Sequence, residues 1–184
     1  MPARGAQRRE AAEPPDATAA MEIAVRFLGA RPRTRWELDR RLRRGGVGES
    51  VIEVTLDRLA DLGYVDDAAF ARWWGEQRDR HAPRGRRMIE AELRQHGVGR
   101  DVIEAYRVEH VAPERAPEDV ALPGTEEDRA DEALARHLKG RPLPDDRPSF
   151  QRIGMFLVRR GFDPGTVRAA LRRAGSHADE GGER

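Results

Sequence analysis

One apolar pattern occurs three times in this chain of 184 residues and constrains its fold more than any other feature. In each copy, apolar residues stand eight and four positions before a glycine and one and six positions after it. Spacing by four is helical, and a glycine after an amphipathic stretch is typical of a helix that ends in the left-handed conformation. The chain is therefore predicted to repeat one helical unit three times. The copies read Leu38, Leu42, Gly46, Val47 and Ile52; Ile89, Leu93, Gly97, Val98 and Ile103; Ile153, Leu157, Gly161, Phe162 and Val167.

Signals for helix starts recur at similar intervals along the sequence. Thr34 with Glu37 and Ser50 with Glu53 both fit the capping box, and Asp163 followed by proline fits an N-cap before the first helical residue. No stretch alternates like a strand. Nine helices are predicted, near residues 18–30, 34–45, 50–62, 67–80, 85–96, 101–110, 125–139, 149–160 and 164–174.

The fold class predicted from these signals is all-α, an elongated curved array of three tandem three-helix repeats. A unit of about 45 residues buries too little apolar surface to be stable alone, so the repeats are expected to stack. The polar ends and the acidic, proline-rich stretch between the second and third copies are expected to lie outside the repeats. The predicted segments are a disordered tail at 1–17, repeats at 18–65, 66–110 and 125–175, a linker at 111–124 and a disordered tail at 176–184.

The net charge of +1 conceals strongly charged segments. The chain has 34 basic and 33 acidic residues, and all basic residues except Lys139 are arginine. Between Arg31 and Arg44 seven arginines stand against two acids. No apolar run approaches the roughly 20 residues that span a bilayer, and the N-terminus lacks the apolar core of a signal peptide. We expect a soluble, cytoplasmic monomer without membrane contact.

Enzyme chemistry finds little support in the sequence. The chain contains no cysteine, its five histidines show no His-x-x-x-His pair, and no serine lies in a G-x-S-x-G turn. The Gly-Val-Gly stretches at 46–48 and 97–99 lack the third glycine of a dinucleotide site and recur as a repeat connector. The carboxylates of Asp66 and Asp67 open a helix, where capping is the common role. The sequence predicts no catalytic residue, no metal site and no cofactor.

Arginines on the outer faces of the repeated helices give the main functional signal. Helical geometry places them outside when the repeated apolar residues face inward, and a row of guanidinium groups can bind phosphates or an acidic protein surface. The alternative is that these arginine-bearing faces are only solvated and have no binding function. Trp36, opposite the buried side of its helix, and Trp74 are candidate partner contacts, with packing against a neighbouring repeat as the alternative for Trp74. The candidate partner-binding residues are Arg40, Arg43, Arg44, Arg87, Arg94, Arg152, Arg159, Trp36 and Trp74.

Four segments, in the same order along the chain, resemble a known family. Residues 63–71, GYVDDAAFA, resemble the G-Y-[IV]-D-D-x-x-F-A signature of the RecX regulatory proteins, after the sequence RWEL at 35–38. Residues 85–93, GRRMIEAEL, are similar to the G-x-x-x-I-x-x-E-L segment of the family, and RRGF at 159–162 is similar to its closing motif. The resemblance spans roughly residues 20–174.

The resemblance implies a non-enzymatic modulator of the RecA recombinase. Members of this family lie in the groove of the RecA filament on single-stranded DNA and suppress its ATP hydrolysis, strand exchange and co-protease activity. The implied partners are therefore the RecA filament and the single-stranded DNA within it, and the implied processes are recombination, DNA repair and the SOS response. The alternative is a direct DNA-binding protein whose repeats act as helix-turn-helix modules. The net acidic character of residues 50–62 speaks against it.

Overall fold

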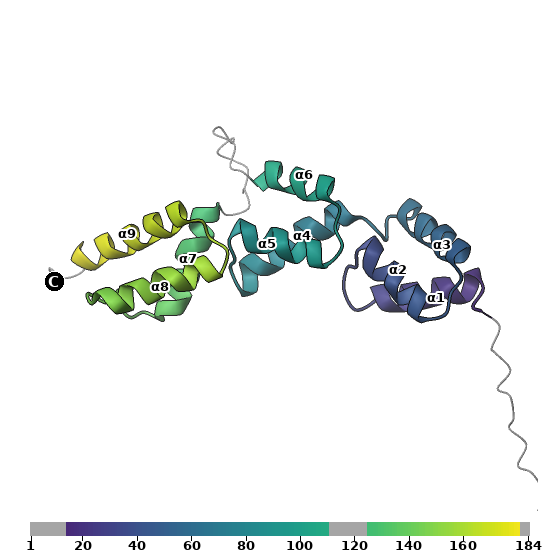
Figure 1. Cartoon of the computed structure of the whole chain (residues 1–184), viewed down its shortest axis with the longest axis horizontal. Helices are drawn as coiled ribbons and strands as arrows, with labels where there is room; N and C mark the ends of the chain where they lie inside the picture. Colours follow the sequence, from purple (N-terminus) through teal and green to yellow (C-terminus); the bar gives the residue numbers. More distant parts are fainter. Residues whose placement is uncertain (1–13, 111–124, 181–184) are drawn as a thin grey trace, which may run out of the picture. The chain divides into compact units, whose positions relative to one another are not determined.

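The structure is a computed structural model that describes residues 14–110 and 125–180, with side chains up to residue 176. The described residues form nine α-helices and no strand, as predicted (Figure 1). The chain divides into two compact units, Met1–Val65 and Asp66–Arg184. The helices are α1 (Ala17–Leu28), α2 (Arg35–Arg44), α3 (Glu49–Asp61), α4 (Asp67–His81), α5 (Arg86–Gln95), α6 (Arg100–His110), α7 (Glu126–Leu138), α8 (Arg147–Arg159) and α9 (Pro164–Glu180).

The helix bounds agree with the predicted ranges to within two residues, except at the end of α9. That helix continues to Glu180, so the prediction of a disordered tail from residue 176 is wrong for residues 176–180. Likewise, α1 begins at Ala17, the last residue of the predicted N-terminal tail, because Asp16 caps it. The predictions for residues 1–13, 111–124 and 181–184 lie outside the described residues, and the elongated, curved stacking of the repeats stays a prediction.

The repeated glycines end the middle helix of each repeat as predicted. Gly46, Gly97 and Gly161 have φ values of +78°, +76° and +90°, which only glycine adopts without strain. The N–H group of Gly46 donates to the carbonyl of Arg43 at 3.0 Å, and that of Val47 donates to the carbonyl of Leu42 at 3.2 Å. This pair of bonds defines the Schellman motif, and the other two repeats have the same pair. The repeated sequence pattern is therefore a repeated helix end.

Side-chain caps explain most helix starts. Thr34 forms the predicted capping box with Glu37, and Asp163 accepts hydrogen bonds from the N–H groups of Gly165 and Thr166 at 2.7 and 3.2 Å. Asp66 caps α4, as expected from its place in the sequence. The capping box predicted at Ser50 is wrong, because α3 begins at Glu49 and its N-cap is Gly48, which has no side chain to accept a bond.

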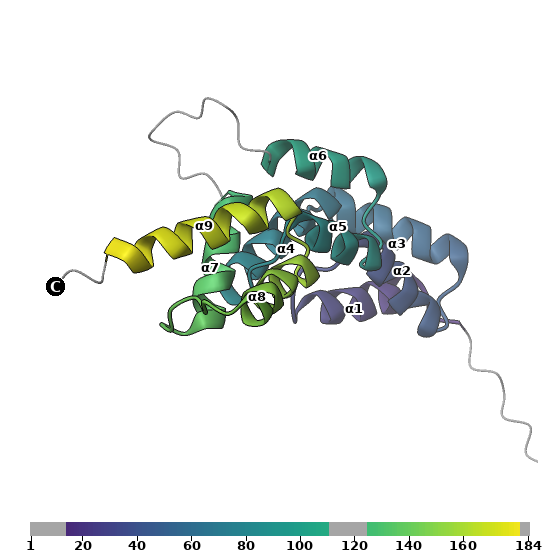
Figure 2. The ribbon, with the colours of Figure 1, turned by 60° about the vertical axis from the view of Figure 1, so that its left-hand side comes forward.

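Each repeat encloses its own apolar core. The buried residues fall into three clusters, one within α1 to α3, one within α4 to α6 and one within α7 to α9. The four apolar positions of the repeated pattern are at most 7% exposed in all three copies. In the third repeat α9 packs along both α7 and α8, and these three helices lie side by side in Figures 1 and 2. The repeat is therefore the packing unit as well as the sequence unit.

Backbone contacts join the second and third repeats within the second compact unit. The N–H group of Gly85 donates to the carbonyl oxygen of Arg160 at 2.9 Å, and a guanidinium N–H of Arg160 donates to the carbonyl of Pro83 at 3.2 Å. A Cβ atom on Gly85 would lie 2.2 Å from the carbonyl carbon of Gly161, and one on Gly161 would lie 2.5 Å from Cβ of Met88. The two backbones meet at a separation that only glycines permit. This contact is the seam between repeats 2 and 3.

Candidate partner-binding surfaces

The outer face of α2 carries an exposed aromatic ring beside uncompensated arginines. Leu38 and Leu42 are fully buried, so the other side of the helix faces solvent. Trp36 is 40% exposed, and the guanidinium of Arg40 lies 4.5 Å from the centre of its ring. Among the described residues, Arg40 and Arg44 have no carboxylate partner. Trp36, Arg40 and Arg44, spaced by four residues, are called the α2 ridge below.

Arg43, on the same helix, is compensated by two carboxylates. Its guanidinium donates to Asp39 at 2.8 Å and forms a two-pronged ion pair with Glu49. These hydrogen bonds, first those with Glu49 and then the one with Asp39, raise the pKa of Arg43 above its ordinary value. A partner would have to displace two acids to reach this arginine. Arg43 therefore contributes less to a binding face than the ridge does.

Arg94, at the equivalent position of the second repeat, is compensated by Glu90. Glu90 is only 6% exposed, and it accepts hydrogen bonds from Arg94 at 3.1 Å and from Arg107 at 2.9 Å. Burial alone would raise the pKa of Glu90, but the hydrogen bonds from Arg107 and Arg94 outweigh it and lower that pKa below its ordinary value. The arginine pattern common to repeats 1 and 2 thus serves local ion pairs.

The two remaining predictions for the second repeat have different outcomes. Arg87 on α5 is exposed, and its charge acts on the carboxylate of Asp163. Trp74 is held inside its own repeat, since its indole N–H donates to Glu92 at 2.9 Å and Arg78 stacks over its ring at 4.3 Å. Phe70 stacks on the same ring at 5.9 Å. Trp74 therefore packs within its own repeat, and not against a neighbouring repeat as the alternative had it.

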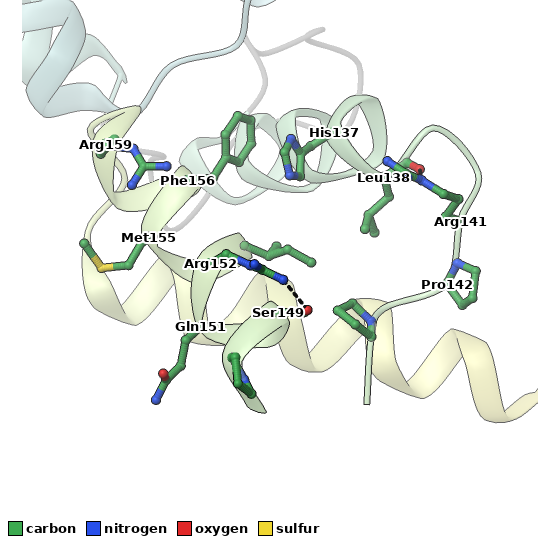
Figure 3. Close-up of a pocket in the computed structure, with 13 residues that line it drawn as sticks. His137, Leu138, Arg141, Pro142, Ser149, Gln151, Arg152, Met155, Phe156 and Arg159 are labelled. Atoms are coloured by element: carbon green, nitrogen blue, oxygen red, sulfur yellow. Dashed lines mark hydrogen bonds between the residues drawn. The ribbon is translucent and has the colours of Figure 1, made fainter. Parts of the chain in front are cut away.

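Arg152 and Arg159 line a groove of about 950 Å³ in the third repeat. Figure 3 shows that the groove runs between α8 and the loop after α7, which contributes Arg141 and Pro142. None of its 13 described lining residues is acidic. Sequence reasoning missed the loop, because irregular backbone has no periodicity from which to predict which side chains converge. It also missed His137 on α7, because the approach of α7 to α8 depends on how the two helices pack. The residues besides the two predicted arginines include His137, Leu138, Arg141, Pro142, Met155 and Phe156.

The helices that would serve as recognition helices present carboxylates to solvent. On α3 the exposed side chains include Glu53, Asp57 and Asp61, and Arg58 is the one exposed arginine on that helix. On α6, Arg107 is bound to Glu90 and Glu104. Because DNA presents phosphates, such faces repel it. The geometry therefore disfavours a helix-turn-helix role.

Two searches of the described residues yield no other kind of site. Across residues 14–110 and 125–176, acidic and histidine side chains nowhere gather in the groups of three or more that hold a metal ion. In the same ranges every helix is too short or too polar to serve as a transmembrane segment. The arginine-bearing faces and the groove are therefore the features to explain.

Family models and known proteins match this chain along most of its length. A model described as RecX, first three-helix domain, matches residues 20–59, and one described as RecX, second three-helix domain, matches residues 66–106. Regulatory protein RecX of Thermobifida fusca (strain YX) is 36% identical, over 97% of this chain and 96% of the relative. Regulatory protein RecX of Mycobacterium avium (strain 104) is 37% identical, over 82% of this chain and 81% of the relative.

Solved structures show the same fold. The crystal structure of RecX from Lactobacillus salivarius superposes with a TM-score of 0.67 at 18% identity, over 86% of this chain and 96% of that one. The fold and its repeated helix ends define an all-α helical-repeat protein. The sequence relatives specify it further, and the chain belongs to the RecX family of regulatory proteins.

Proposed function

We propose that this protein binds the RecA filament on single-stranded DNA and inhibits its ATPase, strand-exchange and co-protease activities. In this role it modulates recombination, DNA repair and the SOS response, acts in the cytoplasm as a monomer, and needs neither a cofactor nor a catalytic residue. Membership of the RecX family supports a regulatory role. The choice of RecA as partner follows from the family resemblance of the motifs at residues 63–71 and 85–93.

The observation that carries the proposal is the α2 ridge. Arg40 and Arg44 project guanidinium groups that no described carboxylate compensates, next to the exposed ring of Trp36. Guanidinium groups bind phosphates and carboxylates in two-pronged geometry, and tryptophan and arginine are the residues that most often dominate the energy of an interface. A filament of protein and DNA offers both kinds of anion. Arg87, Arg152 and Arg159 extend the same chemistry to the other repeats.

Direct DNA binding is the alternative, and the two proposals predict different salt dependence. A protein that neutralises several phosphates loses affinity for bare DNA steeply as salt rises. Contacts to a protein filament through one tryptophan and a few arginines give a shallower dependence. Inhibition of RecA at concentrations where bare single-stranded DNA stays unbound supports the filament proposal.

The test adds the purified protein to RecA on single-stranded DNA and follows ATP hydrolysis, with binding to bare DNA measured in parallel across a salt series. Substoichiometric inhibition with weak binding to bare DNA is expected. Tight binding to bare DNA with a steep salt slope, and inhibition only through competition for DNA, would refute the proposal.

A matched pair of variants tests the α2 ridge itself. Arg40→Glu/Arg44→Glu is expected to raise the concentration for half-inhibition about tenfold, since each lost charged contact at a partly exposed site is worth roughly 0.5–1 kcal/mol and each reversal adds repulsion. The control is Arg26→Glu/Arg58→Glu, which makes the same charge change at exposed arginines of α1 and α3. Arg43 stays unchanged, because its substitution would also break the bonds to Asp39 and Glu49. If both variants inhibit RecA equally well, the α2 ridge is not part of the binding face.

A further inference from the structure

The groove of the third repeat combines positive charge with apolar walls. Its volume of about 950 Å³ is far larger than a single anion needs and suits a few residues of a chain. All 13 described side chains that line it are basic, polar without charge, or apolar. Any ligand for this space must therefore supply the negative charge itself.

The arginines of the groove keep donors available for such a ligand. Arg141 donates from Nε to the carbonyl of Leu138 at 3.1 Å, and Arg152 donates to the hydroxyl of Ser149 at 2.6 Å, the bond drawn in Figure 3. Arg159 is exposed. Arg152 also interacts electrostatically with Asp146, which is not among the lining residues, whereas Arg141 and Arg159 have no carboxylate partner among the described residues. The bond to the Leu138 carbonyl orients Arg141 without compensating its charge.

Prolines and a methionine form the apolar part of the walls. Pro142, Pro144 and Pro148 are among the lining residues, and so is Met155 of α8, which is 51% exposed. Proline and methionine side chains offer apolar surface and carry no strong hydrogen-bonding group that would need a partner. Methionine also adapts to side chains of varied shape. Such walls fit aliphatic side chains.

The one aromatic ring of the lining besides histidine has no face left for a nucleobase. The ring of His137 stacks on Phe156 with the centres 3.9 Å apart and the planes 22° from parallel. The guanidinium of Arg160 lies over the same ring, 4.7 Å from its centre. Since a parallel ring at 3.9 Å covers one face, the guanidinium occupies the other. Base stacking, which supplies much of the affinity for single-stranded nucleic acid, is therefore not available at Phe156.

We propose that this groove binds an acidic peptide segment that carries aliphatic side chains, contributed by a protein partner. The carboxylates pair with Arg141, Arg152 and Arg159, and the aliphatic groups pack on the prolines and Met155. The inference deepens the proposed function, on which it rests for the existence of a protein partner. It assigns to the third repeat the recognition of a peptide, separate from the α2 ridge.

The probe is a fluorescein-labelled peptide of 12 residues that alternates glutamate pairs with leucine, and its binding to the full chain is followed by anisotropy. A peptide with lysine in place of glutamate and a labelled dT12 oligonucleotide are the comparison probes. The acidic peptide is expected to bind at least about tenfold more tightly than either. Preference for dT12, or no binding of the acidic peptide, overturns the proposal.

Variants locate the binding within the molecule. Arg141→Glu/Arg159→Glu is expected to weaken peptide binding about tenfold or more, and Met155→Asp to weaken it with all arginines retained. The control Arg168→Glu/Arg172→Glu makes the same charge change at exposed arginines of α9, in the same repeat. Its affinity is expected to stay within about twofold of the wild type. If the groove variant and the control lose the same affinity for the peptide, the effect comes from net charge alone and the proposed site is overturned.

Further results distinguish the groove inference from the proposed function and from self-association. If the protein inhibits RecA but does not bind the acidic peptide, the groove inference fails and the proposed function stands. If it binds the peptide in the groove but leaves RecA unaffected, the proposed function fails and the groove stands. Sedimentation velocity tests a second copy as occupant, because self-association that Arg141→Glu/Arg159→Glu abolishes would overturn a peptide site.

Discussion

The substitution Gly161→Ala tests the seam between repeats 2 and 3, because an alanine at this position is unfavourable for two separate reasons. The first is its φ of +90°, which an L-residue adopts at a cost of about 1–2 kcal/mol, offset in part by the lower entropy of the unfolded chain. The second is the backbone of Met88, whose N lies 2.6 Å from the position of the new Cβ. Overpacking of this kind costs about 1–3 kcal/mol. We expect Gly161→Ala to lower the free energy of unfolding by about 2–4 kcal/mol.

Two glycines of the same compact unit allow the two reasons to be tested separately. Gly140 has a φ of +78° with nothing within 4 Å of an added Cβ, so Gly140→Ala isolates the backbone strain, about 1 kcal/mol. Gly85 has a φ of −69° but would place its Cβ 2.3 Å from the carbonyl oxygen of Gly161, so Gly85→Ala isolates the overlap. Urea titrations followed by circular dichroism give the three free energies, and hydrogen exchange of α5 and α8 reports on the seam. If Gly161→Ala and Gly140→Ala prove equally mild, the reasoning about the seam is refuted.

Two further predictions concern side chains whose roles the structure distinguishes. Trp74→Ala should lower the free energy of unfolding by about 3 kcal/mol, because it removes a ring packed on Phe70 and bonded to Glu92. Trp36→Ala should change this free energy by less than about 0.5 kcal/mol. Equal effects of the two substitutions in urea titrations would contradict this assignment. The hydroxyl of Thr166 donates to Asp163 and holds the pKa of that carboxyl below its ordinary value, so the cap stabilises α9 fully above about pH 4 and loses its effect as the pH falls through the lowered pKa. Asp163→Ala should therefore cost about 1 kcal/mol at pH 7 and progressively less in titrations from pH 5 to pH 2, and a constant difference would show that the charge plays no part.

The helices and their repeat were predictable because local chemistry fixes them. A glycine that ends a helix, a threonine or aspartate that caps one, and apolar residues spaced by four act over less than two turns. The same reasoning failed at Ser50, where the sequence of a capping box is present but the helix begins one residue earlier, at Glu49. It also failed at residues 176–180, since nothing in a short polar stretch distinguishes a tail from the continuation of α9.

The binding surfaces were predictable only in part, because compensation depends on distant residues. Helical geometry correctly placed Arg43 and Arg94 outside, but their ion pairs with Glu49 and Glu90 depend on how neighbouring groups fold together. Trp74 meets Glu92, 18 residues further on, and no spacing rule connects them. Exposure of an arginine therefore follows from sequence, whereas its availability to a partner does not.

Comparison of the three repeats explains why the groove of the third has no acid. In the first repeat Glu37 binds Arg31 at 2.7 Å, and in the second Glu92 binds Arg78 at 2.7 Å, so each middle helix carries one carboxylate that compensates arginines from the preceding element. In the register set by the repeated glycines, the residues of α8 equivalent to Glu37 and Glu92 are Arg152 and Phe156. The third repeat thus replaces one internal carboxylate by a cation and the other by a ring. The two positions on α8 that are equivalent to these carboxylates therefore contribute no negative charge to the groove.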